Sequence, residues 1–177
     1  DTRTYDDVIQ AMKSKNYTTI HPEVGDSYAF GESSFTILSP ARNYEDSNDC
    51  SIVQRLTHGS NTFLFTGDAE EEAENDMLAS GMDLSADVLK VGHHGSHTST
   101  SDAFLDAVSP TYAVISCETG NSYGHPHAET LNKLRAADVQ MFRTDDQGTI
   151  TASSDGSTLT WNTSPSDDWV SGSGRTK

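Results

Sequence analysis

The sequence predicts an α/β domain of layered architecture, in which a sheet carries helices on a face. Two observations lead to this prediction. Strand-like runs come in adjacent pairs in the first half of the chain, and strands alternate with amphipathic helical patterns in the second half. Alternation of strands and helices packs helices against a sheet. The 177 residues are enough for one domain with a substantial core.

The N-terminal third combines one helix with paired strands. Residues 1–16 carry Val8, Ile9 and Met12 at helical spacing, which predicts an amphipathic helix. A short strand is expected over residues 18–20, before His21. Four further strand-like runs, paired into two hairpins, are expected at residues 28–30, 35–38, 51–57 and 61–66.

A helix is predicted over residues 69–80. Its first turn holds Glu70, Glu71 and Glu72, which suit the positive end of the helix dipole. Gly81 suits the position just past the helix end. The acidic run is therefore interpreted as a solvated helix start and not as a ligand cluster.

Strands and helices alternate after this helix. Strands are predicted at residues 86–91 and 112–116. Ser101 is expected to cap a helix over residues 102–108, and Pro126 to open a helix that ends near Ala137. Three more strand-like runs are expected at residues 139–143, 148–152 and 158–161.

Residues 1–163 are thus predicted to form the domain, and residues 164–177, rich in Ser, Gly and Asp, a linker or tail. The two cysteines, Cys50 and Cys117, lack the C-x-x-C spacing of zinc sites. We interpret them as two small buried thiols, in preference to a disulfide.

Composition limits the classes of partner. The chain has 27 acidic residues against 11 Lys and Arg, a net charge of −16. An acidic surface repels polyphosphate backbones, which argues against a duplex-binding module. The sequence contains no run of about 18 apolar residues, so no membrane segment is expected. Few lysines and many Ser and Thr residues suit an extracellular or cell-surface bacterial protein.

Asp68 is a candidate metal ligand. It follows the apolar run 63–65 and Gly67, at the point where a buried strand ends. Carboxylate oxygens at such positions bind Zn²⁺ or Mn²⁺. The alternative role of Asp68 is as N-cap of the following helix, for which Asp is a preferred residue.

His93 and His94 give a stronger indication of chemistry. Gly92 and Gly95 flank them, at the end of another apolar run. A strand alternates its faces and could bury only one of two adjacent histidines. Glycines permit a tight turn and the close approach of an ion or phosphate. The alternative is an ordinary solvated loop.

A third cluster lies at residues 121–127, between a predicted strand and a helix N-terminus. Such a position favours anion binding. His125 is the better candidate because it directly precedes the helix, whereas His127 lies inside the expected first turn and is predicted to face solvent.

These motifs occur in the order found in a known family. They are Asn48 with Ser51-Ile52-Val53, Thr66-Gly67-Asp68, residues 87–96, residues 121–126 and the late segment 143–150. Together they resemble the metallo-β-lactamase fold, in a branch similar to the hydrolase domain of the competence protein ComEC/Rec2. The resemblance covers residues 35–150.

The resemblance implies an αββα sandwich with two divalent metal ions, zinc or manganese. Asp68 would bridge the metals and one histidine of the pair, taken here as His94, would bind metal. His93 and His125 would face the substrate phosphate as catalytic residues. Substrate contacts are assigned to Ser96, Asn121, Tyr123 and Lys90. The implied reaction is phosphodiester hydrolysis by metal-bound hydroxide, on nucleic acid, including single strands, or on a smaller ester.

One departure from the family qualifies this reading. The family's H-x-H-x-D-H motif, which supplies most of the ligands, is absent from the sequence. We therefore interpret the chain as the second half of the fold, with the first half of the same domain as its partner. Two alternatives remain. The first is a phosphocholine-esterase-like hydrolase with an aromatic cage drawn from Tyr112, Tyr123 and Trp161, and the second is a non-catalytic binding module.

Overall fold

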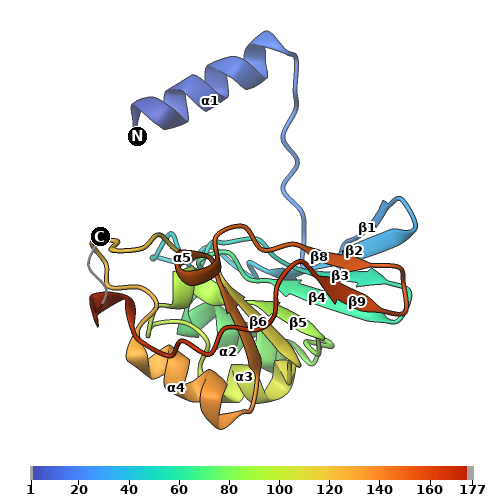
Figure 1. Cartoon of the computed structure of the whole chain (residues 1–177). Helices are drawn as coiled ribbons and strands as arrows, with labels where there is room; N and C mark the ends of the chain where they lie inside the picture. Colours follow the sequence, from blue (N-terminus) through green and yellow to red (C-terminus); the bar gives the residue numbers. More distant parts are fainter. Residues whose placement is uncertain (1, 175–177) are drawn as a thin grey trace.

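The computed structural model describes residues 2–174 and is organised around one seven-stranded sheet, whose strands follow the chain order β1 to β7 (Figure 1). The predicted α/β architecture is confirmed. The strands are β1 (Ser27–Phe30), β2 (Ser33–Ser39), β3 (Val53–His58), β4 (Asn61–Phe65), β5 (Val88–Lys90), β6 (Tyr112–Ile115) and β7 (Gln140–Arg143).

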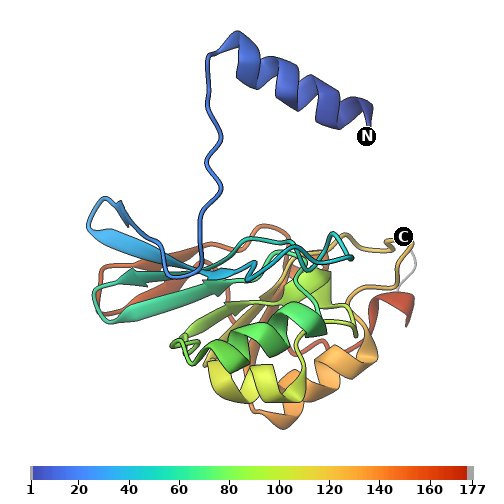
Figure 2. The same cartoon turned by 180° about the vertical axis from the view of Figure 1, so that it is seen from behind.

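Strands of the two halves pair in different ways. β1 to β4 pair antiparallel as consecutive hairpins, and β4 to β7 pair parallel. Each parallel connection contains a helix, and all three helices cross the same face because such crossovers are right-handed. They are α2 (Glu71–Ser80), α3 (Asp102–Val108) and α4 (Ala128–Ala136). Both Figure 1 and Figure 2 show them together below the sheet.

The hydrophobic core lies between the sheet and these three helices. Leu64 and Leu89 from the sheet and Phe104, Leu131 and Leu134 from the helices are fully buried, at 0% exposure. Along β4, Leu64 points into this core while its neighbours Phe63 and Phe65 point to the other face, as the alternation of a strand requires.

The other face of the sheet is apolar and partly open. Phe63 and Phe65 stack there with ring centroids 6.5 Å apart, and Phe65 is 37% exposed. A two-stranded hairpin, β8 (Ala152–Ser154) and β9 (Leu159–Trp161), covers one end of this face. Trp161 of the hairpin stacks on Phe142 of β7 at 4.1 Å. The hairpin also reaches the turn between β3 and β4, where the Ser154 hydroxyl donates to Oδ1 of Asn61 at 2.8 Å. Ala152 and Trp161 of the hairpin line a groove on this face together with Phe63 and Phe65.

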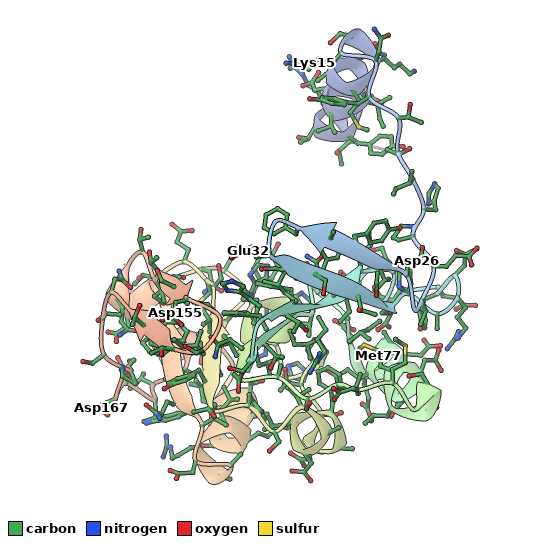
Figure 3. All side chains as sticks on the ribbon, turned by 90° about the vertical axis from the view of Figure 1, so that its right-hand side faces the viewer. Lys15, Asp26, Glu32, Met77, Asp155 and Asp167 are labelled. Carbon is green, nitrogen blue, oxygen red and sulfur yellow. The ribbon has the colours of Figure 1, made fainter. Side chains whose placement is uncertain are left out.

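Helix α1 (Arg3–Ser14) forms as predicted but has no buried residue. Figure 3 shows Lys15, just past the end of α1, on the opposite side of the sheet from Met77 of α2. Tyr5 and Val8 of its apolar stripe are 55% and 51% exposed. Residues 18–20, predicted as a strand, are extended but unpaired, so that prediction was wrong. Among residues 2–174, no helix has both the length and the apolar character needed to cross a membrane.

The starts of two helices differ from those considered in the sequence analysis. The N-cap residue of α2 is Glu70 and not Asp68, the alternative role considered for that residue. Oδ1 of Asp49, from a distant loop, accepts the backbone N–H groups of Glu70 and Ala73 at 2.9 and 3.1 Å and so caps this helix end. Pro126 does not open α4, because the N-cap residue is His127 and Pro126 precedes it. By contrast, Ser101 caps α3 as predicted.

The two cysteines are free, as expected, but neither is fully buried: Cys50 is exposed and Cys117 is partly buried. The segment for which the sequence predicts a linker or tail lies against the domain through Gly174. Ser166 is only 6% exposed, and its N–H donates to the Met141 carbonyl oxygen at 2.7 Å. A short helix, α5 (Thr144–Gln147), also follows β7 and was not predicted.

Replacing Glu74 by Leu should lower the free energy of unfolding by about 3 kcal/mol. Glu74 is 2% exposed, and its carboxylate accepts the N–H groups of Thr100 and Ser101 at 2.5 and 2.8 Å. The substitution leaves both donors without this acceptor. Urea unfolding monitored by circular dichroism measures the loss. Glu71→Leu, in the same helix turn but exposed, is the control and should stay within about 0.5 kcal/mol. Equal effects of the two changes would contradict this account.

Candidate active site

The carboxyl ends of the parallel strands meet at one edge of the sheet, and the candidate residues gather there. Asp68 follows β4, His93 and His94 follow β5, and Asn121 and His125 lie in the loop after β6. Loops at this edge are the usual ligand-binding positions of parallel sheets. The strand order thus brings together residues that lie up to 57 positions apart in the sequence.

His94 and Asp68 face each other across this edge. Nε2 of His94 lies 3.6 Å from Oδ1 of Asp68, and both side chains are about half exposed. The other ring nitrogen, Nδ1, donates to the Ser116 carbonyl oxygen at 2.7 Å. Because a carbonyl only accepts, the proton of a neutral ring resides on Nδ1, and the lone pair of Nε2 points toward Asp68.

His93 is held in a matching way by Glu70. Nδ1 of His93 lies 2.8 Å from Oε1 of Glu70, which also accepts the Thr98 hydroxyl at 2.8 Å. The carboxylate fixes the proton of the neutral ring on Nδ1 and leaves the Nε2 lone pair free. Glu70 is therefore a site residue that the sequence reasoning missed, since it had assigned the whole acidic run to solvent. The signal in the sequence that could have indicated Glu70 is its position two residues after the strand-end Asp68.

His125 completes the cluster. Its ring centroid lies 5.4 Å from that of His93 and 6.2 Å from that of His94. The residue is 6% exposed. Burial, reinforced by the neighbouring rings of His127, His93 and His94, lowers the pKa of His125 to about 4. His125 is therefore neutral at physiological pH.

A cavity of about 830 Å³ opens beside these rings. Its walls include His94, His125, Asn121, Tyr123 and Cys117. Tyr123 is 77% exposed and stacks on His125, with ring planes 16° apart. Burial, together with Asp145, raises the pKa of the Cys117 thiol to about 12, which makes it a poor nucleophile.

Asn121 shapes this loop. Its Oδ1 accepts the N–H of His125 at 3.0 Å, and its Nδ2 donates to the His125 carbonyl oxygen at 2.6 Å. Both ends of the Asn121 amide are therefore used within the loop. The sequence prediction placed Asn121 in the site, and the structure gives it a supporting position there.

Two residues that we had assigned to substrate contacts lie away from the cavity. Ser96 is 3% exposed, and its hydroxyl is paired with that of Thr98 at 2.8 Å. Lys90 lines the apolar groove of the open sheet face with Phe63 and Phe65, and its Nζ donates to the Val91 carbonyl oxygen. Burial lowers the pKa of Lys90, against the opposing effect of Asp68.

His127, predicted to face solvent, belongs to a second histidine pair. Its Nδ1 lies 2.9 Å from Nδ1 of His97 and accepts the His97 backbone N–H at 3.0 Å. Its Nε2 donates to the Tyr123 carbonyl oxygen at 3.1 Å. These bonds tie the loop after β6 to the loop after β5.

The geometry of Asp68 and His94 fits one edge of a metal coordination tetrahedron. Two ligands bonded to one Zn²⁺ ion lie roughly 3.4 Å apart. The observed oxygen–nitrogen distance is 3.6 Å. Within residues 2–174, no group of three or more His, Cys, Asp or Glu side chains is arranged to hold a metal ion. The pair therefore fits as part of a metal site.

Comparisons with known proteins agree with this architecture. Residues 41–119 match the metallo-beta-lactamase superfamily. The chain is 35% identical over 144 residues to ComE operon protein 3 of Bacillus subtilis, covering 81% of this chain and 19% of that protein. It is 41% identical over 118 residues to competence protein ComA of Neisseria gonorrhoeae, covering 66% and 17%. Recombination protein 2 of Haemophilus influenzae is 40% identical over 103 residues, covering 56% and 13%.

The chain is thus a protein of the metallo-β-lactamase fold, a superfamily whose members are generally hydrolases that bind divalent metals such as zinc. Within that fold it is a ComEC/Rec2-like protein. The chain spans less than a fifth of the length of these curated relatives.

His125 should make the stability of the chain fall as the pH drops from about 6.5 to about 4. The folded-state pKa of His125, about 4, lies below the ordinary value of 6.5, so the unfolded state binds more protons in this window. The free energy of unfolding attributable to this residue should decrease by about 2 kcal/mol across the window. Urea titrations at a series of pH values measure it. His125→Gln, which cannot titrate, should remove this part of the pH dependence, and an unchanged slope would contradict the assignment.

Proposed function

We propose that this chain carries part of the active site of a metal-dependent hydrolase that cleaves phosphodiesters. The observation that supports it is the convergence of Asp68, His93, His94 and His125 at the carboxyl ends of the parallel strands. Each of the paired histidines has Nδ1 committed to a fixed acceptor. Acceptors of that kind orient metal ligands and catalytic bases.

In this proposal Asp68 and His94 provide two of the metal ligands. A metal-binding histidine typically donates the N–H of its other ring nitrogen to a fixed acceptor. For His94 this acceptor is the Ser116 carbonyl oxygen, which accepts from Nδ1 and leaves Nε2 for the metal. Divalent ions, two in the complete domain and either zinc or manganese, would supply Lewis-acid activation of the ester. The ligands that this chain lacks come from the partner described below.

His93 acts as the proton-transfer residue. Its Nε2 is free to take a proton, and Glu70 stabilises the imidazolium that forms. His125 is neutral and offers a ring N–H to a phosphate oxygen. The ring centroids of His93 and His125 lie 5.4 Å apart, so both rings can contact the same phosphate.

The partner is the first half of the same domain, packed on the open face of the sheet. Phe63 and Phe65 are left partly exposed on this face, which the β8–β9 hairpin covers only in part. The apolar stripe of α1 stands unpacked on the same side. A further sheet on this face would bury these surfaces and bring ligands to Asp68 and His94.

The substrate is a phosphodiester of nucleic acid, in single-stranded form, or a smaller ester. Tyr123 has an exposed ring at the cavity and stacks on His125. An exposed aromatic ring of this kind can stack with an unpaired base of a single strand. The net charge of −16 disfavours a long duplex. The name of one relative, competence protein ComA, refers to competence, and we extend that role to this chain, at the outer surface of a bacterium.

A phosphocholine-esterase-like activity is less well supported. It requires an aromatic cage, for which Tyr112, Tyr123 and Trp161 were candidates. Tyr112 of β6 and Trp161 of β9 pack together with ring centroids 5.2 Å apart, while Tyr123 lines the cavity. The three rings therefore lie at two separate places.

Hydrolysis of bis(p-nitrophenyl) phosphate and of a fluorescent single-stranded oligonucleotide tests the proposal. The chain is assayed alone and fused behind the first half of a relative's domain, each with Mn²⁺ or Zn²⁺. The fusion should be active and the isolated chain inactive. In the fusion, Asp68→Asn and His94→Gln should each lower kcat/KM by 100-fold or more, an effect of about 3 kcal/mol.

His21→Gln is the matched control, because His21 lies outside the cluster, and it should keep full activity. Elemental analysis of the same samples should find bound metal in the fusion and a lower content in the Asp68→Asn variant. A folded fusion without bound metal and without turnover would overturn the proposal and favour the non-catalytic binding module.

A further inference from the structure

The segment that carries His125 contacts two glycines from different parts of the chain. The first is Gly95 of the histidine loop, where a Cβ atom would come within 2.7 Å of the Pro126 Cβ. The His127 N–H also donates to the Gly95 carbonyl oxygen at 2.9 Å. The second is Gly172, near the C-terminal end of the described chain. The position of His125 therefore depends on both neighbours.

Gly172 makes the closer approach. Its N–H donates to the Pro126 carbonyl oxygen at 2.9 Å, and the residue is buried. A Cβ atom on Gly172 would overlap the His125 carbonyl oxygen and lie 2.5 Å from its carbonyl carbon. Real Cβ atoms do not come so close to backbone, so any side chain at Gly172 must displace the His125 segment or the C-terminal segment. Only glycine fits this contact.

Arg143 holds the part of the C-terminal segment that precedes Gly172 in the sequence. Its Nη1 donates to the carbonyl oxygens of Asp168 and Val170, each at 2.8 Å. The opposite side of the guanidinium makes two bonds to the Asp145 carboxylate, at 2.8 and 2.7 Å. The Arg143 side chain is fully buried. A buried guanidinium with its donors engaged in this way is a rigid anchor.

Two further contacts hold the same segment. The Ser166 N–H donates to the Met141 carbonyl oxygen of β7, and the Ser166 hydroxyl donates to Asp146 at 2.6 Å. The Trp169 ring lies 5.0 Å from the Arg135 guanidinium carbon on α4. The segment is therefore attached to β7, α4 and α5 before it reaches the His125 loop.

We propose that residues 166–174 form a C-terminal brace that positions His125. Gly172 is the contact point, and Arg143 is the anchor that keeps the brace in place. Neither residue touches the reacting atoms, so both are positioning residues. The catalytic consequence rests on the proposed hydrolytic function, whereas the positioning itself does not.

The first test compares Gly172→Ala with Gly174→Ala in the 177-residue chain by NMR. Gly174 is the matched control, because its added Cβ would meet only the end of the Val170 side chain, at 3.1 Å. Gly172→Ala should shift the His125 ring Cε1–Hε1 resonance and speed amide exchange of Asn121 and His125 tenfold or more. Amides of β5 to β7 should keep their protection. Gly174→Ala should match the parent, and parental His125 resonances in Gly172→Ala would overturn the proposal.

A second variant, truncated after Ser171, guards against misfolding of Gly172→Ala. It removes Gly172 without introducing a clash and keeps both peptide carbonyl groups that Arg143 binds, those of Asp168 and Val170. The same shift of the His125 resonance and faster exchange at His125 are expected. An unchanged His125 in the truncated chain would show that the brace does not position it.

Activity of the fused domain supplies the functional readout. Gly172→Ala should lower kcat by 10-fold to 100-fold with little change in KM. A displaced His125 is misaligned with the reacting phosphate, which slows the chemical step more than it weakens substrate binding. A parental kcat in a variant whose His125 resonance has shifted would overturn the catalytic part. An inactive parent fusion would defeat the proposed function and leave the NMR test of the brace intact.

Discussion

Parallel pairing of β4 to β7 brings the carboxyl ends of four strands to one edge of the sheet. The proximity of the candidate site residues depends on that arrangement. The loops after β4, β5 and β6 carry Asp68, the histidine pair and His125, respectively. At the end of β7, Arg143 pairs with Asp145 of α5 and anchors the C-terminal segment. The crossover helices lie on a single face because their handedness is fixed. They bury the core behind the loops and leave the loop edge accessible.

A second level of organisation orients the side chains. Glu70 and the Ser116 carbonyl oxygen fix the Nδ1 protons of His93 and His94 and so direct the two Nε2 atoms. Glu74 holds the backbone that follows the histidine loop, from inside the core. These acceptors are buried or partly buried, so water competes weakly with them. The cluster is therefore organised by its surroundings before any substrate arrives.

The sheet is built asymmetrically, and this shapes the functional conclusion. One face is closed by three helices, whereas the other is covered only in part, by the β8–β9 hairpin. The aromatic residues of β4 lie on the open part, next to the strand end that carries Asp68. A partner that covers this face would therefore act on stability and on the site together, because the same strand serves both.

Local sequence determined the elements and the types of chemistry. Period-two and helical patterns predicted the hairpins, the parallel strands and the helices, and strand-end residues indicated Asp68, His93, His94 and His125. Only the tertiary structure showed that Glu70 supports His93, that Asp49 instead of Asp68 caps α2, and that His127 pairs with His97. It also showed that the Ser/Gly-rich C-terminal segment packs against His125 and that Lys90 and Ser96 lie away from the cavity. The physical reason is that each of these roles is a contact between residues distant in sequence. Local patterns record which face a residue takes, but not which distant group it meets there.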